Sequence, residues 1–391
     1  MTLIALLVFW IGLGIVVYTY AGYGLVIFVL SKLVGKKHKS SDTDELPAVT
    51  LVIAAYNEEG FIEEKIRNTS ELQYPADKLS VFVVTDGSTD RTAALVANHP
   101  SIKHFHEPAR RGKIHAVNRI MKYVKTPIVI FSDANCYLNA EAIRNIVRHY
   151  ADPKVGGVAG EKRVLLGAAD NASGSGEGIY WKYESFLKRK DSEVYSIVGA
   201  AGELFSIRTQ LFEEPPPDSI IEDFYMSMRI AQRGYRFIYE PDAIATESAS
   251  ASIAEEWKRK VRICAGGFQS MARLLPLLNP LSYGMLSFQY VSHRVLRWSL
   301  APLALPLIFF SNAILIQTGN LFYKISLASQ ILFYVFSALG FLMRDKKIEL
   351  KGFFVPYYFV VMNLSVYFGL VRYLSGSQSV IWEKAKRAKP V

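Results

Sequence analysis

The sequence predicts an α/β domain with a mainly parallel sheet, accompanied by transmembrane α-helices, one N-terminal and about three C-terminal, and by an interfacial helix. Two observations support this fold class. Strand-like and helix-like segments alternate between residues 46 and 273, which is typical of sheets whose parallel strands are joined by helices. Outside that region lie four long stretches without a charged residue, in a 391-residue chain that is 51% hydrophobic and 20% charged.

The uncharged stretches are long enough to cross a bilayer, whose hydrocarbon core of about 30 Å needs roughly 20 apolar residues in a helix. The first is too long for a signal peptide and has no charged segment in front of it, so we interpret it as a retained anchor. The stretches cover residues 3–30, 298–323, 325–343 and 352–371.

These stretches divide the chain into three parts. We expect a transmembrane anchor at 1–31, the α/β domain at 45–275, and an interfacial helix with the C-terminal transmembrane region at 276–391. The segment 274–297 is apolar with scattered Pro, His and Arg, and we expect it to lie on the bilayer surface.

Basic residues concentrate beside the apolar stretches and account for much of the formal net charge of +10. Because positively charged loops stay in the cytoplasm, we expect a multi-pass protein of the cell inner (plasma) membrane with a cytoplasmic α/β domain. Clustering beside membrane segments favours lipid headgroups over nucleic acid as the partner. One cluster lies at 344–351, and another follows the first stretch at Lys32, Lys36, Lys37, His38 and Lys39.

Only two cysteines occur, Cys136 and Cys264, far apart in the chain. They provide neither a disulfide framework nor a cysteine metal site, which is consistent with a reducing compartment.

Polar residues follow several of the expected strands. Strands are expected at 48–55, 79–87, 102–107 and 127–134, and helices at 61–72, 88–97, 112–124 and 140–150. In parallel sheets, ligands bind beyond the carboxyl ends of the strands. One polar strand end is often only a turn, but three at one edge indicate a binding site. The residues at these ends are Asn57, Glu58, Glu59, Asp86, Asp133 and Asn135.

The residue types at this edge suit a nucleotide diphosphate. Asp133 offers a carboxylate to a hard divalent cation, and Asn135 offers a weaker, neutral oxygen. Lys113 has a mobile positive charge suited to a phosphate, whereas the two arginines before it are typical of a solvated basic turn. Asp86 either hydrogen-bonds a base or ribose, or caps the helix that follows it.

The second half of the region contains two further features. A flexible Gly/Ser-rich loop is expected at 167–178, followed by an amphipathic helix at 179–190. Gly199 and Gly202 leave room for another group to approach the backbone closely.

Glu222 and Asp223 form a second acidic pair, just before an expected helix. In a dry site, neighbouring carboxylates raise the pKa of one member, which can then act as a general base. Stabilisation of the helix N-terminus is the competing interpretation, and these two residues alone favour it.

Seven short motifs occur in one order along the chain: AAYNEEG, VVTDGSTD, RRGKIHAVN, FSDAN, GAAGELFSIR, IIEDF and RKVR. Each is weak alone, but the ordered set, with the placement of the apolar stretches, resembles the membrane-bound glycosyltransferase family 2 over essentially the whole chain. The resemblance implies the GT-A fold, a nucleotide-binding α/β domain. The general plan is similar to polysaccharide synthases and to ceramide glucosyltransferase.

The resemblance implies a metal-dependent, inverting glycosyltransferase with a nucleotide-sugar donor, a UDP-sugar first, and a lipid-linked or polysaccharide acceptor. Asp133, with Asn135, would hold Mg²⁺ or Mn²⁺, and Lys113 would meet the pyrophosphate. The full donor-binding set would be Ala55, Tyr56, Glu58, Asp86, Lys113 and Asp133.

The resemblance also implies the catalytic residues. Asp223, with Glu222 beside it, would deprotonate the acceptor hydroxyl that attacks the anomeric carbon. The residues near the acceptor or the diphosphate would be Arg259, Arg262, Gly199 and Gly202.

Two motifs depart from the family pattern. The family's DxD appears as Asp133-Ala134-Asn135, which leaves the second metal ligand open. The family's (Q/R)xxRW ends here in Ile263, which offers no aromatic surface for an acceptor sugar. This departure weakens the case for a processive synthase. Trp181 is either a replacement stacking residue or a buried structural one.

Two other functions fit the sequence less well. A catalytically impaired member would bind a nucleotide or a partner without turnover. A transporter is disfavoured because the apolar stretches lack the charged residues that mark an ion path. A polymer would cross so few helices only if more helices, or a partner, completed a channel.

Overall fold

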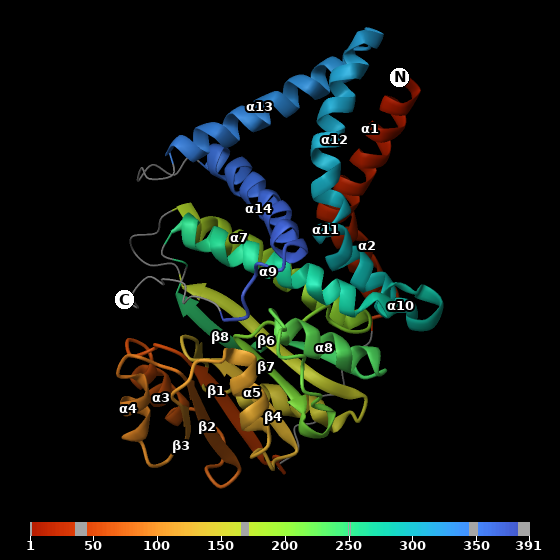
Figure 1. The fold of residues 1–391 in the computed structure, drawn as a ribbon. Coiled ribbons are helices and arrows are strands. Elements are labelled where there is room, and N and C mark those ends of the chain that lie inside the picture. The colour runs from red at the N-terminus through yellow and green to blue at the C-terminus, as the bar shows by residue number, and fades with distance from the viewer. Residues whose placement is uncertain are drawn as a thin grey trace.

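The structure is a computed structural model that describes residues 2–35, 45–165, 172–248, 250, 252–343 and 351–381. A sheet domain lies at one end and long apolar helices at the other, with the N-terminus at the tip of the helices (Figure 1). The basic residues 36–39 and the segment 344–350, on which the topology prediction depends, lie outside the described residues.

Eight strands form one sheet in the order β3-β2-β1-β4-β7-β6-β8-β5. The neighbours β3, β2, β1 and β4 run parallel, as do β6 and β8, whereas β7 and β5 run antiparallel to their neighbours. The prediction of a mainly parallel α/β sheet is confirmed. The strands are β1 Val49–Ala55, β2 Leu79–Asp86, β3 Lys103–Glu107, β4 Ile128–Asp133, β5 Tyr137–Leu138, β6 Val155–Leu165, β7 Leu204–Arg208 and β8 Arg236–Ser248.

The helices of the sheet domain follow the predicted alternation. One expectation is corrected: the Gly/Ser-rich segment is helical from Ala172 onwards, because α7 begins there, and only 167–171 lie outside the described residues. These helices are α3 Ile62–Ser70, α4 Thr92–Ala97, α5 Lys113–Met121, α6 Ala142–Val147, α7 Ala172–Val194, α8 Glu222–Gln232 and α9 Ile253–Arg273.

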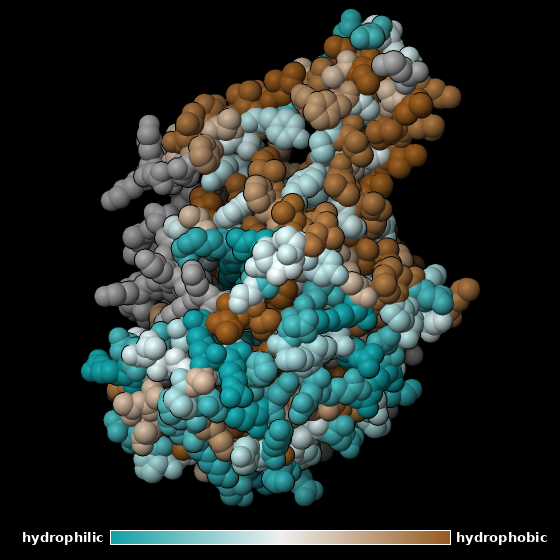
Figure 2. Space-filling model, in the orientation of Figure 1, coloured by the Kyte–Doolittle hydropathy of each residue, from teal (hydrophilic) through white to brown (hydrophobic). Residues whose placement is uncertain are grey.

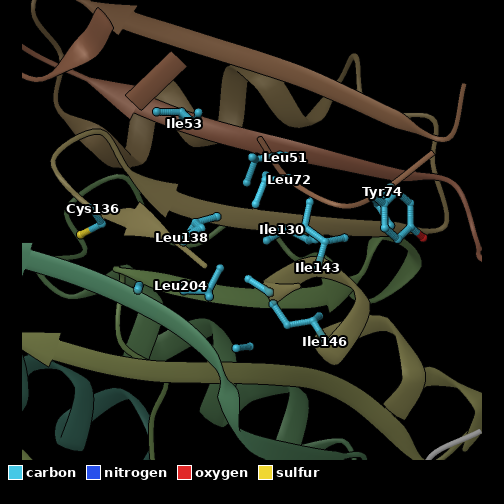
Figure 3. Packing of buried hydrophobic residues seen from close by; sticks show 14 of the residues in the cluster. Leu51, Ile53, Leu72, Tyr74, Ile130, Cys136, Leu138, Ile143, Ile146 and Leu204 are labelled. Atoms are coloured by element: carbon cyan, nitrogen blue, oxygen red, sulfur yellow. The ribbon is translucent and has the colours of Figure 1, made fainter. Parts of the chain in front are cut away.

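Alternating side chains of the central strands pack against helices on both faces of the sheet. Leu51 of β1 and Ile130 of β4 belong to one cluster with Ile143 and Ile146 of α6 (Figure 3). Val52 belongs to the opposite cluster, which α5 and α8 cover. Each fully buried aliphatic side chain contributes about 1.5–3 kcal/mol, so the two layers fix the strand register.

That register brings the polar strand ends together. Ala54 of β1 pairs with Asp133 of β4, and Ala55 pairs with Thr85 of β2, one residue before Asp86. The carboxyl ends of β1, β2 and β4 therefore meet at one edge of the sheet, as the sequence predicts.

Within the residues that the structure describes, four helices are long and apolar enough to span a membrane. The N-terminal one joins α1 (Thr2–Val17), a π-helical turn (Tyr18–Gly22) and α2 (Tyr23–Leu33). The hydrophobic surface covers these helices, and the hydrophilic surface covers the sheet domain (Figure 2). The predicted number and order of apolar helices are confirmed, the later ones being α12 Leu300–Leu315, α13 Leu321–Met343 and α14 Lys351–Leu374.

Helix α14 packs along α9, the basic helix of the sheet domain, over most of its length. Tyr358 shares a cluster with Ile253 at the start of α9. Further on, Phe368 lies against Trp257 at a ring distance of 5.3 Å. At the far end Tyr373 stacks on Phe268 at 6.3 Å. Helix α14 therefore begins beside the end of α13 and follows the sheet domain from Tyr358 to its C-terminal end (Figure 1).

The segment expected to lie on the bilayer has two different halves. The first, with α10 (Pro280–Tyr290), exposes apolar side chains, and Leu281 is 96% exposed. The second, with a π-helical turn (Val291–Val295) and α11 (Leu296–Trp298), is buried against α7. His293 there is fully buried beside Asp191 of α7, so this half belongs to the protein interior and not to the bilayer surface.

Candidate active site

A cavity of about 1050 Å³ lies beyond the carboxyl ends of β1, β2 and β4 and extends to the apolar helices. It brings together all but one of the site residues that the sequence predicts. Those lining it are Ala55, Tyr56, Glu58, Asp86, Lys113, Asp133, Asn135, Gly202, Glu222, Asp223, Arg259 and Arg262.

Lys113, at the first position of α5, lies between Asp133 on one side and the Glu222–Asp223 pair on the other. Its Nζ lies 2.7 Å from Oδ1 of Asp133 and 3.1 Å from Oε1 of Glu222. Burial alone would lower the pKa of Lys113, but Asp133, Glu222 and Asp223 raise it well above its usual value. The ammonium group is therefore charged and able to pair with a phosphate.

Gly202 provides the space in which these groups meet. A Cβ there would lie 3.0 Å from Nζ of Lys113, 3.4 Å from Oδ2 of Asp223 and 3.6 Å from Oδ2 of Asp133. The glycine thus lies at the centre of the predicted donor and catalytic groups, as expected from its close-approach role.

Asp223, in the first turn of α8, has the electrostatics of a general base. Burial, followed by the charge of Glu222, raises its pKa to about 7, while Lys113 acts in the opposite direction. The helix N-terminus does not explain this arrangement by itself. Among the described residues, Oδ1 accepts a hydrogen bond from the adjacent Phe224 N–H alone, at 2.8 Å, and Oδ2 faces Gly202. A carboxylate with this pKa takes up a proton near neutral pH.

Asp86 is buried at the end of β2 and organises the loop before α5. Its Oδ2 accepts hydrogen bonds from the backbone N–H groups of Arg111 (3.0 Å) and Gly112 (2.6 Å). Its Oδ1 is buried without a hydrogen-bond partner in the described part of the chain and belongs to the cavity lining. The helix-cap interpretation does not hold, because Asp90 accepts from the N–H of Thr92 instead.

An aromatic surface lies beside Asp86. The guanidinium of Arg110 stacks on the ring of Tyr56 at 3.7 Å, so Arg110 is part of the cavity, whereas Arg111 is exposed as a solvated turn residue. A flat cationic and aromatic pair of this kind suits a nucleoside. Glu58 is buried nearby, and its backbone N–H donates to Oγ1 of Thr92 at 2.7 Å.

Asp133 and Asn135 are the predicted metal ligands, and both face the cavity. The described residues contain no group of three or more His, Cys, Asp or Glu side chains arranged for a metal. Mg²⁺ and Mn²⁺ at nucleotide sites commonly use one or two carboxylates and take further oxygens from the phosphates. The donor set of one carboxylate and one amide oxygen therefore fits a cation shared with a diphosphate.

The remaining predicted residues differ in their roles. Arg262 lines the cavity and donates to the carbonyl of Ile220 at 3.0 Å. Arg259 is held by Glu256 at 3.1 Å. Gly199 does not line the cavity: at φ +88° it makes room for Phe224, whose ring a Cβ would approach to 2.2 Å. Gly199 leaves steric room for the residue after Asp223 and is the one predicted site residue outside the cavity lining.

Several lining residues were not predicted as site residues. Trp298 packs on Phe224 at 5.3 Å and fits against α9 because Gly267 has no side chain. Glu203 lies beside the predicted Gly202 and pairs with Lys162 at 2.5 Å. Trp298 reaches the site, and Lys162 reaches Glu203, by long-range packing that no local sequence pattern indicates.

Lys65 supports the end of β4 next to Asp133 from the interior of the domain. It is fully buried, and its Nζ donates to Oγ of Ser132 at 2.8 Å and to the carbonyl of Cys136 at 2.5 Å. Burial lowers its pKa to about 8. The sequence pattern could have indicated this burial, because Lys65 lies on the apolar face of α3, one residue before Ile66.

Comparison with known proteins identifies the family. The family model for glycosyl transferase family 2 matches residues 50–214. This part of the chain is a glycosyl transferase family 2 domain. That range holds β1 to β4 with Asp86, Lys113 and Asp133, and it ends shortly before Asp223.

Family 2 relatives include polysaccharide and glycolipid synthases. A poly-beta-1,6-N-acetyl-D-glucosamine synthase of Staphylococcus aureus (strain MSSA476) is 28% identical over 252 residues, which are 61% of this chain and 58% of that protein. A beta-monoglucosyldiacylglycerol synthase of Synechocystis sp. is 26% identical over 246 residues, which are 59% of this chain and 50% of that protein. The match thus spans between half and three-fifths of each relative's length.

A solved structure shares the whole architecture. The mannosyltransferase from Pyrobaculum calidifontis, in complex with GDP-Man and Mn²⁺, has a TM-score of 0.71 and 24% identity, and the match covers 94% of this chain and 99% of that one. This confirms the GT-A fold with its apolar helices.

Proposed function

We propose that this family 2 protein is a metal-dependent, inverting glycosyltransferase with a nucleotide-sugar donor. The acceptor is lipid-linked or a polysaccharide, and a UDP-sugar is the first candidate donor. The observation that supports this most strongly is the convergence of Lys113, Asp133, Glu222 and Asp223 around Gly202. Diphosphate-binding groups and a base with a pKa near 7 lie there within one cavity.

The roles follow from the geometry. The stacked Tyr56 and the unpaired Oδ1 of Asp86 hold the nucleoside, and Lys113 neutralises the diphosphate. Asp223 takes the proton of an acceptor hydroxyl, whose oxygen forms a bond to the anomeric carbon. The bond from that carbon to the diphosphate oxygen breaks, and its electron pair leaves with the nucleoside diphosphate. Attack opposite the leaving group inverts the configuration.

Asp133 and Asn135 would hold Mg²⁺ or Mn²⁺ against the diphosphate. When bound, such a cation stabilises the negative charge that develops on the leaving group. The bound cation in the Pyrobaculum calidifontis neighbour supports this proposal.

We further propose that the sheet domain faces the cytoplasm of the cell inner membrane. Support comes from the basic residues at the ends of the apolar stretches. The boundaries at 1–31, 45–275 and 276–391 describe the anchor, the transferase domain and the interfacial and C-terminal membrane region.

A direct assay tests the function. Purified full-length protein is incubated with UDP-sugars and GDP-sugars, Mg²⁺ or Mn²⁺ and a lipid extract, and the products are identified by mass spectrometry. We expect one donor to yield a nucleoside diphosphate together with a glycosylated product. The second candidate is the impaired, nucleotide-binding member, which the amide of Asn135 in place of a carboxylate favours. Tight nucleotide binding without release from any donor would support that candidate and overturn ours.

A further inference from the structure

Three cations line the part of the cavity that adjoins the membrane helices: Lys188 of α7, Arg294 and Arg297. Arg297 lies close to the N-terminal membrane helix. Its guanidinium is 5.8 Å from the ring of Tyr183, whose hydroxyl donates to the carbonyl of Tyr20 at 3.0 Å.

Three carboxylates act on the charge of Lys188, namely Glu184, Glu203 and Glu161, and Glu184 also contacts both arginines. It pairs with Arg294 and accepts from Arg297 at 3.1 Å. Nε and one terminal nitrogen of Arg297 are buried and have no hydrogen-bond partner in the structure as described. Lys188 is only 4% exposed and forms no ion pair within the described ranges, and its nearest aromatic contact is the Trp181 ring at 5.7 Å.

Neighbouring carboxylates are already engaged. Glu203 is bound to Lys162 at 2.5 Å. Asp191 accepts from Tyr23 at 2.5 Å and bonds His293 at 2.6 Å. Burial lowers the pKa of Lys188, which reflects the unfavourable free energy of a poorly compensated buried charge. An anion bound here would supply the missing negative charge.

The wall next to these cations is apolar and aromatic. Helix α14 contributes Phe354, Tyr358, Phe359 and Met362 to the cavity lining. The N-terminal helix closes on α14 at Tyr20, whose ring lies 5.1 Å from Phe359. A ligand that satisfies both surfaces has an anionic head and a hydrocarbon tail.

We infer that Lys188, Arg294 and Arg297 bind the phosphate or diphosphate headgroup of an acceptor lipid, whose hydrocarbon chain lies along α14. The inference rests on the proposed function and narrows its acceptor to a lipid that carries a phosphate or diphosphate in addition to the acceptor hydroxyl. Arginine and lysine match phosphate oxygens in charge and hydrogen-bonding capacity. A neutral polysaccharide acceptor would leave this charge uncompensated.

The test measures binding, independently of turnover. Native mass spectrometry of the full-length protein in detergent would compare farnesyl phosphate, farnesol and UDP with Mn²⁺. We expect farnesyl phosphate to bind more tightly than farnesol. Lys188→Gln and Arg297→Gln should each lower the affinity for farnesyl phosphate about tenfold or more and leave UDP binding unchanged. Lys188→Arg keeps the charge, so it should bind farnesyl phosphate like the unmodified protein. If Arg297→Gln fails to fold, the comparison of Lys188→Gln with Lys188→Arg tests the inference.

The matched control is Lys182→Gln, because Lys182 is an exposed cation of the same helix outside the cavity. It should bind farnesyl phosphate like the unmodified protein. The inference fails if farnesol binds as tightly as farnesyl phosphate, or if Lys188→Gln and Lys182→Gln lose affinity equally. A loss of UDP binding would instead assign the cations to the donor diphosphate. Sugar transfer to a lipid-free glycan by a protein that ignores farnesyl phosphate would overturn this inference and leave the proposed glycosyl transfer intact.

Discussion

Lys113 and Asp133 form an ion pair of 2.7 Å where the end of β4 meets the start of α5. Glu222 is 3.1 Å from the same ammonium group. One positive charge is therefore shared by two carboxylates that lie about 90 residues apart in the chain. In the proposed mechanism Lys113 turns from Asp133 to a phosphate, which would make Asp133 available to a divalent cation. We therefore expect diphosphate binding and cation binding to depend on each other, and variants of Asp133 and of its neighbours test this.

Asp133→Ala should lower turnover by about 10²-fold or more, because a cation beside the diphosphate loses its carboxylate ligand. The thermal midpoint should change little, since a partly exposed ion pair stabilises a protein by about 1 kcal/mol or less. The measurement is nucleoside diphosphate release against Mn²⁺ concentration. Turnover at the unmodified rate with an unchanged Mn²⁺ dependence would contradict the metal role.

Asn135→Asp serves as the companion variant. It adds a charged oxygen at the second position of the Asp133-Ala134-Asn135 motif, so we expect retained turnover and half-maximal activity at lower Mn²⁺ concentration. If this variant is inactive, Asn135 has a role other than that of a weak metal ligand.

Asp223→Asn tests the base. The amide keeps the shape but cannot accept the proton, so turnover should fall by roughly 10² to 10⁴ with similar UDP affinity. If Asp223 served only the helix N-terminus, the change would reduce stability by about 1 kcal/mol or less and leave catalysis largely intact. Turnover and UDP affinity measured on one preparation separate the two roles.

The pH dependence of turnover provides the internal control for the role of Asp223. Only the ionised carboxylate of Asp223 acts as a base, so turnover should rise with pH up to its pKa of about 7 and level off above it. Burial and the charge of Glu222 both raise that pKa. Glu222→Gln should therefore stay active and move the rising limb to lower pH. An inactive Glu222→Gln beside an active Asp223→Asn would reverse the assignment within the pair.

Gly202→Ala should reduce turnover about tenfold, because its Cβ would approach Lys113 Nζ to 3.0 Å and displace it from the carboxylates. The fold should survive, since the neighbouring atoms are ends of flexible side chains. Gly60→Ala is the control, because a Cβ there meets nothing within 4 Å. Equal activity of the two variants would show that Lys113 tolerates displacement.

The donor end of the site could be predicted because its order is local. Alternation fixes which side chains of β1 and β4 are buried, and parallel pairing then places Asp86 and Asp133 at one edge. The same argument predicted Lys113 at the site, because its helix begins directly at this edge. The seven motifs fall largely in this part of the chain.

The membrane end could not be predicted in the same way. Glu184 and Arg294 are 110 residues apart and meet only because α7 packs on the segment after α10. That segment has the composition of an interfacial helix, yet burial of His293 between α7 side chains decides its position. Local hydropathy does not distinguish a bilayer surface from an apolar protein interior.

The course of α14 leads to a topology prediction. Four membrane-spanning helices with an external N-terminus would put the C-terminus outside, together with its basic residues. Tyr358 lies near one end of α9 and Tyr373 stacks near the other, so α14 lies beside the sheet domain from Tyr358 to Tyr373. We therefore expect three crossings, with α14 remaining on the cytoplasmic side.

Single cysteines reacted with a membrane-impermeant maleimide on intact cells test this topology. Gln317→Cys, in the exposed turn between α12 and α13, should be labelled from outside. Ser375→Cys, exposed just after α14, and a cysteine in the loop 344–350 should react only after permeabilisation. The native Cys136 and Cys264 are buried and should give little background. Labelling of Ser375→Cys in intact cells would show that α14 crosses the bilayer, and labelling of the loop would place the sheet domain outside as well. A protected Ser375 would instead explain how the basic C-terminus follows the preference of positive charge for the cytoplasm, with α14 held by its contacts along α9.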